Sequence, residues 1–192
     1  MRLRYNRVMQ NRLVLVVGPS GVGKDSVLDA ARSLLQGRSD VIFPRRVVTR
    51  APGLGGEDYI AVDEAAFATM ADEGAFALHW PAHGLLYGIP VTIDAQLRAG
   101  RQVVINVSRT IIDEARQRYP GMMVIGITAA PDVLRQRLQA RNRESAAEIE
   151  QRLARAASFT LSGDDVAILH NDGALADAVQ QFVALLDRQR GK

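Results

Sequence analysis

Residues 18–24 read Gly18-Pro19-Ser20-Gly21-Val22-Gly23-Lys24 and lie between an apolar run, residues 13–17, and a stretch with helical periodicity. Their spacing is that of a phosphate-binding loop, G-x-x-x-x-G-K. Small residues let successive backbone N–H groups turn inward around phosphate oxygens, and the N-terminus of the following helix adds positive potential. We therefore predict that this segment binds the phosphates of a nucleotide, with Lys24 on the β- and γ-phosphates.

An ordinary glycine-rich turn between a strand and a helix is the alternative interpretation. Two observations favour phosphate binding. The apolar run, the loop and the helical pattern occur in the order that such a loop requires. The chain also has 24 lysines and arginines, of which only Lys24 and the C-terminal Lys192 are lysines, so lysine occurs where a flexible point charge is needed.

The residue after Lys24 departs from the usual pattern. Ser or Thr normally offers a hydroxyl to Mg²⁺ at this position, whereas this chain has Asp25, followed by Ser26. One interpretation is that Asp25 supplies a carboxylate ligand for Mg²⁺, while Asn106 supplies a neutral oxygen from a neighbouring strand end. The other is that Asp25 favours the first turn of the helix by charge–dipole attraction, worth about 0.3–1 kcal/mol. Both can hold at once.

Length and composition narrow the class of protein. A chain of 192 residues with 47% apolar residues can bury a substantial core, and we expect a single α/β domain over residues 1–192. Cysteine is absent, and the three histidines are scattered, so neither a disulfide framework nor a Cys-based metal site is expected. No apolar run approaches the length of a membrane-spanning helix, and residues 1–12 lack the apolar core of a signal peptide. We expect a cytoplasmic protein with no membrane partner.

The formal net charge of +3 rests mainly on arginine, which binds both nucleic acids and small phosphorylated ligands. Here the arginines come as spaced pairs, without a basic run of five or more, and aromatic residues make up only 5% of the chain. This pattern favours phosphates bound in a cleft and indicates no nucleic-acid partner. The sequence leaves open whether the protein is a monomer or a homodimer.

Apolar periodicity predicts alternating strands and helices. Continuous apolar runs, such as residues 103–105 and 124–127, are typical of a parallel sheet covered by helices on both faces, with ligands at the carboxyl ends of the strands. The predicted strands are 13–17, 41–48, 75–80, 102–107, 122–128 and 166–170. The predicted helices are 24–35, 64–73, 91–99, 109–118, 131–141, 146–159 and 174–189.

Further motifs accompany the loop. They are Thr49-Arg50, Gly56-Glu57-Asp58-Tyr59, Phe76, His83-Gly84-Leu85-Leu86-Tyr87-Gly88, Asn106-Val107-Ser108-Arg109, the arginines at 137, 141 and 152, and Asn171-Asp172. With these motifs the chain resembles, over nearly its whole length, the guanylate-kinase-like branch of the nucleoside monophosphate kinases. The forms G-P-S-G-x-G-K-D, W-x-A-H-G-L-x-Y-G-I-P and N-V-S-R make it similar, within that branch, to the ribose 1,5-bisphosphate phosphokinase family.

The resemblance implies a three-layer P-loop NTPase fold of the guanylate-kinase-like type. It also implies a small acceptor-binding insert at residues 45–90 and an arginine-rich lid at residues 135–155, with ATP and Mg²⁺ as cofactors. The residues implied to bind the nucleotide are Gly18, Pro19, Ser20, Gly21, Val22, Gly23, Lys24, Asp25, Ser26 and Asn171. A helix N-cap is the alternative role for Asn171.

Catalytic roles are implied for Lys24, Arg137, Arg141 and Arg152. Helical spacing places Arg137 and Arg141 one turn apart on one face, so with Arg152 on the next helix they could converge on phosphates. The alternative is a pair of amphipathic helices whose arginines pair with Glu144, Glu148 and Glu150. We prefer this alternative for Arg135, Arg143 and Arg155.

The acceptor side differs from that of guanylate kinases. The positions that read guanine in that family hold Leu78, Ile89 and Ser108 here, and the serine before the Thr-Arg pair is Arg46. Polar groups of guanine buried against Leu78 and Ile89 would stay unpaired, at about 1–3 kcal/mol each. We therefore expect these two residues to form an apolar wall, and the acceptor to be smaller than a nucleotide and richer in phosphate.

Retained arginine and tyrosine positions support a phosphorylated acceptor. The resemblance implies that Arg50, Tyr59 and Tyr87 hold its phosphate. A family arginine three positions beyond Arg50 is Gly53 here, so Arg46 or Arg45 could replace its charge; a solvated strand end is the alternative. The remaining predicted substrate contacts are His83, Asn106, Ser108 and Arg109.

Trp80 is predicted to be either a cover over a small acceptor or part of the core. His79 and His83 lie in a segment with strand and turn character that contains Pro81, so their i, i+4 spacing does not place them on one helical face. We do not expect them to form a metal-binding pair.

The expected reaction is phosphoryl transfer from ATP to ribose 1,5-bisphosphate, which gives 5-phosphoribosyl 1-diphosphate. An ionised phosphate is the nucleophile, so no general base is required. The resemblance also implies a role in phosphonate breakdown. The alternatives are a guanylate kinase or another kinase of small phosphate acceptors, and a non-catalytic guanylate-kinase-like binding module. The module is disfavoured because Gly18, Gly23 and Lys24 are retained together with the arginine series.

Overall fold

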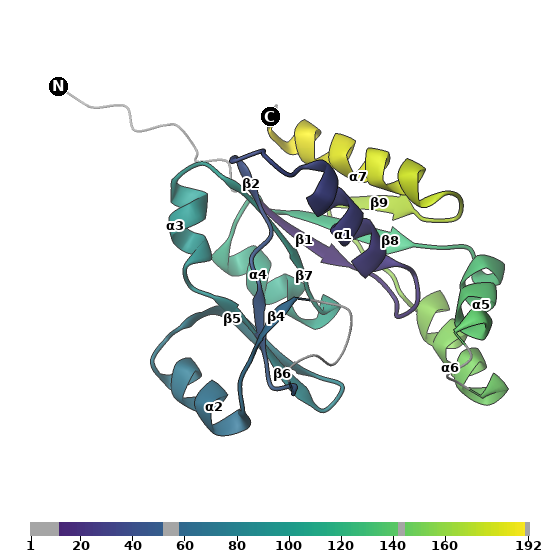
Figure 1. Cartoon of the computed structure of the whole chain (residues 1–192), viewed down its shortest axis with the longest axis horizontal. Coiled ribbons are helices and arrows are strands. Elements are labelled where there is room, and N and C mark those ends of the chain that lie inside the picture. Colours follow the sequence, from purple (N-terminus) through teal and green to yellow (C-terminus); the bar gives the residue numbers. More distant parts are fainter. Residues whose placement is uncertain (1–11, 52–57, 142–144, 191–192) are drawn as a thin grey trace.

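The computed structural model describes residues 12–51, 58–141 and 145–190. The interpretations given above for residues 1–11 and for Gly53, Gly56, Glu57, Arg143 and Glu144 therefore concern positions outside the described residues. Two sheets and seven α-helices make up the described part of the chain (Figure 1). In that part no helix is long and apolar enough to cross a membrane.

A parallel five-stranded sheet forms the centre of the molecule, in the order β2-β7-β1-β8-β9. Its strands are β1 (Leu13–Val17), β2 (Val41–Ile42), β7 (Gln102–Asn106), β8 (Met123–Thr128) and β9 (Val166–His170). All five residues of β1 are buried, because the central strand is covered on both faces. The apolar runs in the sequence therefore reflect helices packed on each side of the sheet.

Alternate residues of β1 belong to two separate cores. Val14 and Val16 pack in one cluster with residues of α1 (Lys24–Leu34) and α7 (Leu175–Arg190). Leu13 and Leu15 pack in another, which includes residues of α3 (Ile93–Arg98) and α4 (Ile112–Arg118). A short 3₁₀ turn, Arg109–Ile111, precedes α4, so the helix predicted from residue 109 begins later than expected. The predicted parallel sheet with helices on both faces is confirmed.

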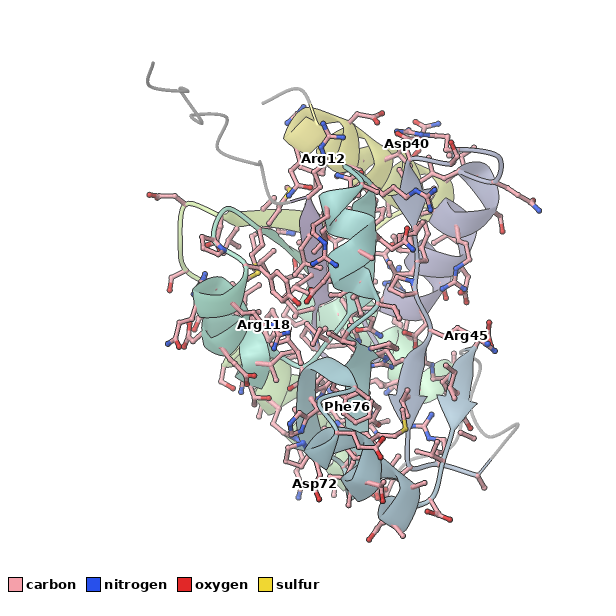
Figure 2. The ribbon with its side chains drawn as sticks, turned by 90° about the vertical axis from the view of Figure 1, so that its left-hand side faces the viewer. Arg12, Asp40, Arg45, Asp72, Phe76 and Arg118 are labelled. Atoms are coloured by element: carbon pink, nitrogen blue, oxygen red, sulfur yellow. The ribbon has the colours of Figure 1, made fainter. Side chains whose placement is uncertain are left out.

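A second, mixed sheet has the order β4-β3-β6-β5. Its strands are β3 (Arg46–Val48), β4 (Tyr59–Ala61), β5 (Phe76–Ala82) and β6 (Leu85–Pro90). Helix α2 (Glu64–Asp72) packs on this sheet, where Phe67 stacks on Phe76 with ring centroids 4.6 Å apart. In Figure 2, Phe76 and Asp72 lie at the opposite end of the molecule from Arg12 and Asp40.

The strand prediction was wrong in this region. The segment 41–48 is not one strand but two, with β2 in the parallel sheet and β3 in the mixed sheet, and Pro44 lies in the irregular stretch between them. Proline lacks the N–H that a ladder requires. Strands β4 and β6 were not predicted, and β5 extends past Pro81. A proline is tolerated there because β5 is an edge strand.

Helices α5 (Pro131–Ala140) and α6 (Ala146–Ala157) form a pair with its own small core of leucine and isoleucine. At the start of α6 the Ser145 hydroxyl accepts from the Glu148 N–H, and the Glu148 carboxylate accepts from the Ser145 N–H. The hydrogen bonds that the Ser145 N–H and hydroxyl donate to this carboxylate lower the pKa of Glu148. An ion pair joins Arg135 to Glu150, which confirms the surface role predicted for Arg135.

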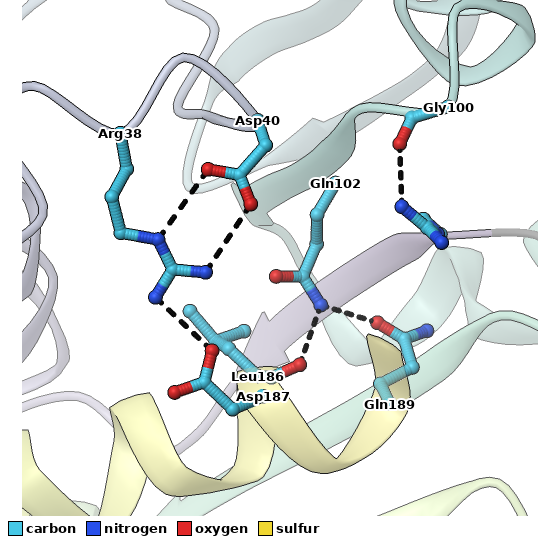
Figure 3. Close-up of polar contacts among 8 residues, drawn as sticks. Arg38, Asp40, Gly100, Gln102, Leu186, Asp187 and Gln189 are labelled. Atoms are coloured by element: carbon cyan, nitrogen blue, oxygen red, sulfur yellow. Dashed lines mark hydrogen bonds and ion pairs between the residues drawn. The ribbon is translucent and has the colours of Figure 1, made fainter. Parts of the chain in front are cut away.

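The amino ends of the parallel strands are tied to α7 by buried polar contacts (Figure 3). Gln102 is fully buried, and its Nε2 donates to the Leu186 carbonyl (3.0 Å) and to Gln189 Oε1 (2.8 Å). Beside it, Arg38 bridges Asp187 of α7 (3.0 Å) and Asp40 (3.3 Å). Ligands of such folds bind at the carboxyl ends of the strands. The contacts described here lie at the opposite end of the sheet.

We predict that Gln102→Leu lowers the free energy of unfolding by about 1–3 kcal/mol, because the Leu186 carbonyl and the Gln189 amide lose their buried donor. Denaturant unfolding measures the change. The control is Gln181→Leu, the same substitution at an exposed position of α7, which should stay within about 0.5 kcal/mol of the parent. Equal stability of the two variants would show that the buried amide contributes nothing.

Candidate active site

A cavity of about 590 Å³ opens at the carboxyl ends of β1 and β7. Its walls come from the glycine-rich loop, the mixed sheet, the segment after β7, and the α5–α6 pair. Seven of its lining residues are basic and one, Asp25, is acidic. The basic ones are Lys24, Arg46, Arg50, Arg109, Arg141, Arg152 and Arg155. Such a lining favours a ligand with several negative charges.

The loop has the shape that its glycines permit. Gly21 and Gly23 have φ values of 91° and 89°, in the left-handed region that residues with a side chain rarely adopt. A Cβ on Gly23 would lie 2.6 Å from Asn171 Nδ2. Six of the seven loop residues line the cavity, whereas Val22 is buried beneath it. The predicted loop therefore forms, with Lys24 as the first residue of α1.

Asn171 supports the loop from behind and does not line the cavity. Its side chain is 4% exposed, and Nδ2 donates to the Val22 carbonyl at 2.9 Å. The N-cap alternative is wrong, because α7 begins four residues later at Leu175. Its buried amide supports the conformation of the loop, and the nucleotide contact predicted for Asn171 stays a prediction.

Asp25 and Asn106 lie side by side at the cavity, with the amide nitrogen of Asn106 and not its predicted oxygen ligand toward the carboxylate. Asn106 Nδ2 donates to Asp25 Oδ1 at 3.1 Å, and both residues line the cavity with Ser26. Within the described residues no group of three or more His, Cys, Asp or Glu side chains could hold a metal alone. These residues therefore fit a hard cation that takes most of its ligands from substrate phosphates and water.

Two stacked aromatic rings form the wall opposite the loop. Trp80 and Tyr87 face each other across β5 and β6, with ring centroids 5.5 Å apart and planes at 10°. The Arg46 guanidinium lies 5.0 Å from the Tyr87 ring and 6.0 Å from the Trp80 ring. At 9% exposure, Arg46 is not a solvated strand end. Arg45 is exposed and pairs with Asp58 at 3.6 Å.

Arg50 and two tyrosines extend this wall. Arg50 Nη2 donates to the Tyr87 hydroxyl at 3.2 Å, and its guanidinium lies 5.5 Å from the Tyr59 ring. Tyr59 itself does not line the cavity, and its hydroxyl donates to the Ala51 carbonyl at 2.6 Å. Of the three residues predicted to hold the acceptor's phosphate, two therefore face the cavity, while Tyr59 packs against Arg50.

The expectation that Leu78 and Ile89 form the acceptor wall was wrong. Their exposed fractions are 1% and 0%, and neither lines the cavity. Alternate residues of a strand share a face, so Leu78 and Trp80 point the same way, and the larger indole is the one that reaches the cavity. Trp80 consequently has both predicted roles: it packs in the core, and it also lines the cavity where a ligand would contact it.

The two histidines lie in different surroundings. His79 is close to the rings of Phe67 and Phe76, at 6.3 and 6.0 Å. His83 occupies the two-residue turn between β5 and β6 with φ 53° and lines the cavity. The first histidine thus packs beside α2, and only the second can meet a ligand.

The arginines of α5 and α6 do not all behave as predicted. Arg152 Nη1 donates to the Ser20 hydroxyl at 2.6 Å, and Arg141 also lines the cavity. Arg137 does not line it and instead donates to the Val22 carbonyl at 3.4 Å. Arg155 was assigned to a surface ion pair, yet it lines the cavity. Its position three residues after Arg152, on the same helical face, is the sequence signal that could have identified it.

The segment after β7 closes the remaining side of the cavity. The Ser108 hydroxyl accepts from the Thr110 N–H at 3.3 Å and caps the 3₁₀ turn. The Arg109 guanidinium lies 5.7 Å from the Phe159 ring, and Nη1 donates to the Ser158 carbonyl at 3.5 Å. Arg109 therefore connects the strand end to the C-terminal end of α6.

Comparisons with known proteins agree with this geometry. The family model described as guanylate kinase matches residues 10–189. The ribose 1,5-bisphosphate phosphokinase PhnN of Acidiphilium cryptum is 50% identical, over 93% of this chain and 94% of that protein. The enzyme of the same name from Pseudomonas fluorescens is 48% identical, over 93% and 96%. Among solved structures, guanylate kinase from Anaplasma phagocytophilum matches with a TM-score of 0.66 at 17% identity, over 94% of this chain and 86% of that one, and shows the shared fold.

We predict that Gly23→Ala weakens ATP binding by at least about tenfold, equivalent to 1.4 kcal/mol, because the new Cβ collides with the amide that holds the loop. Titration calorimetry measures the affinity. The control is Gly37→Ala, since Gly37 also has a positive φ, 95°, but nothing lies within 4 Å of a Cβ there. Both variants share the backbone strain of about 1–2 kcal/mol, so equal ATP affinity in the two would contradict the collision.

Proposed function

We propose that this chain, which belongs to the guanylate kinase family and within it to the ribose 1,5-bisphosphate phosphokinases, transfers the γ-phosphoryl group of ATP to the 1-phosphate of ribose 1,5-bisphosphate. The products are 5-phosphoribosyl 1-diphosphate and ADP. The reaction takes place in one kinase domain, in which residues 45–90 bind the acceptor and residues 135–155 close over the phosphates. A cytoplasmic location and a monomer or homodimer belong to the same proposal.

The charge of the cavity lining is the observation that supports this reaction. The cavity runs from the glycine-rich loop to the stacked rings of Trp80 and Tyr87, and seven cationic side chains line it against one carboxylate. A purine base has no negative charge and needs several hydrogen-bonding partners, whereas a sugar bisphosphate supplies two phosphate groups on a small ring. The charge of the wall thus favours the bisphosphate as the acceptor.

The chemical step needs positioning more than proton transfer. An oxygen of the 1-phosphate forms a bond to the γ-phosphorus, while the bond from that phosphorus to the β–γ bridging oxygen breaks and ADP leaves. The attacking phosphate is already ionised at neutral pH, so no general base acts. Electrostatic stabilisation of the transferring group and in-line alignment supply the rate enhancement.

Each wall has a role in this step. Loop N–H groups and Lys24 bind the phosphates of ATP, and Arg141 and Arg152 neutralise charge on the transferring group. Arg50, oriented by the Tyr87 hydroxyl, binds the 1-phosphate with Arg46 beside it. Arg137 bonds the loop backbone and so acts on loop position. His83, Ser108 and Arg109 complete the acceptor side.

Mg²⁺ fits beside the loop, where Asp25 and Asn106 lie 3.1 Å apart. A bound Mg²⁺ would neutralise phosphate charge and align the reacting groups. Asp25 would supply the negatively charged oxygen ligand, while Asn106 orients that carboxylate through its amide N–H. Ser26, next to Asp25 on the cavity wall, offers a further hydroxyl.

A coupled assay for ADP release across phosphorylated acceptors tests the reaction. We expect ribose 1,5-bisphosphate to have the highest kcat/KM, and GMP to be turned over at least about 100-fold less efficiently, since its base finds no donors or acceptors matched to it. Ribose 5-phosphate, which lacks the 1-phosphate, should not react. A preference for GMP would make the protein a guanylate kinase instead.

We also predict that Asp25→Ser raises the Mg²⁺ concentration needed for half-maximal activity at least about tenfold, because the charged ligand is lost. The control is Asp29→Ser, one helical turn further along α1, where the carboxylate pairs with Arg32. Its magnesium dependence should match the parent. An unchanged magnesium titration of Asp25→Ser would restrict this carboxylate to a helix-stabilising role.

A further inference from the structure

Arg155 lies in the cavity without a role in the reaction described above. Its Nε donates to the Gln151 carbonyl of its own helix at 3.3 Å, and no carboxylate of the described residues forms an ion pair with it. The side chain is exposed, yet it lines the same cavity as Arg152, one turn earlier on α6. A guanidinium held in a cavity beside other cations is destabilised by repulsion unless an anion binds there.

Contacts at the end of α6 distinguish the surroundings of Arg155 from those of Arg152. Arg152 contacts Ser20 of the glycine-rich loop, where the phosphates of ATP would bind. The residues that follow Arg155 contact the segment after β7. The Ser158 hydroxyl donates to the Arg155 carbonyl at 3.0 Å, and the Ser158 carbonyl accepts from Arg109 at 3.5 Å. Arg155 is thus linked to the strand end after β7.

Arg109 is fixed in this corner by neutral partners. Its guanidinium lies over the Phe159 ring, and Nη1 donates to the Ser158 carbonyl. Neither contact cancels its charge, so Arg109 and Arg155 line the cavity as two cations from the segment after β7 and from α6, whereas Arg46 and Arg50 come from β3 and the residues just after it. A second phosphate of the acceptor, distal to the reacting one, would match this pair.

We infer that Arg155 and Arg109 form a subsite for the 5-phosphate of the acceptor, while Arg50 binds the 1-phosphate that reacts. This inference rests on the proposed function. The subsite would distinguish a sugar bisphosphate from a sugar that carries only the 1-phosphate. Two phosphates bound at separate points fix both the position and the direction of the pentose, so the 1-phosphate alone faces the transferring group.

Arg155→Gln tests the subsite, with Arg135→Gln as the matched control. Arg135 lies on the same helix pair, but it pairs with Glu150 and does not line the cavity. We expect Arg155→Gln to lower kcat/KM for ribose 1,5-bisphosphate by about 10- to 100-fold, the usual effect of losing a charged hydrogen bond, with the KM for ATP unchanged. The control should keep the parent values.

Ribose 5-phosphate provides a readout that does not depend on turnover, because it carries only the distal phosphate. Calorimetry should show that it binds the parent, and that Arg155→Gln weakens this binding by the same factor as kcat/KM. Equal affinity of the parent and the variant, or no binding to either, would overturn the subsite. An equal loss for ATP would place Arg155 on the donor phosphates and also overturn it. If the parent binds ribose 5-phosphate but does not phosphorylate ribose 1,5-bisphosphate, the proposed reaction fails while the subsite stands.

Discussion

Mutual repulsion among the cations of one cavity is the constraint on which this structure depends. Seven basic side chains line a space of about 590 Å³. Uncharged groups contact several of them: Arg46 lies near aromatic rings, Arg109 near a ring and a carbonyl, and Arg152 at a hydroxyl. Such partners fix a guanidinium without neutralising it. With one carboxylate among the lining residues, the cavity has a net positive charge, and bound phosphates would relieve the repulsion.

The fold separates the regions that provide stability from those that provide function, and β7 shows this within one strand. At its start, buried Gln102 ties the sheet to α7, with Arg38 and two carboxylates beside it. At its end, Asn106 lies in the cavity against Asp25. Charges at the first end are paired and tie the sheet to α7, whereas charges at the second end line the cavity. The carboxyl ends of parallel strands converge there because every connection returns through a helix.

The parallel sheet and the loop could be predicted from sequence because their signals are local. A strand buried on both faces is a continuous apolar run, and the glycines that shape the loop are adjacent in the chain. The mixed sheet depends on pairing between distant segments. Strands β3 and β4 have three residues each, and β6 contains Gly88 and Pro90, so little in their own sequence marks them as strands. Only the partners across the sheet make them regular.

The same limit explains the errors at the site. Periodicity places Leu78 and Trp80 on one face of β5. It does not predict which of the two side chains the neighbouring elements cover and which stays exposed to the cavity. Packing buries Leu78 and brings the larger indole to the cavity. Likewise, Arg135 and Arg155 look equivalent on amphipathic helices until the packing of α5 on α6 directs one toward Glu150 and the other into the cavity. Residue type and spacing thus predict which charges exist, whereas only tertiary packing decides which of them a substrate can reach. Because this site binds its acceptor through positioned cations, the packing that exposes particular arginines also selects the acceptor.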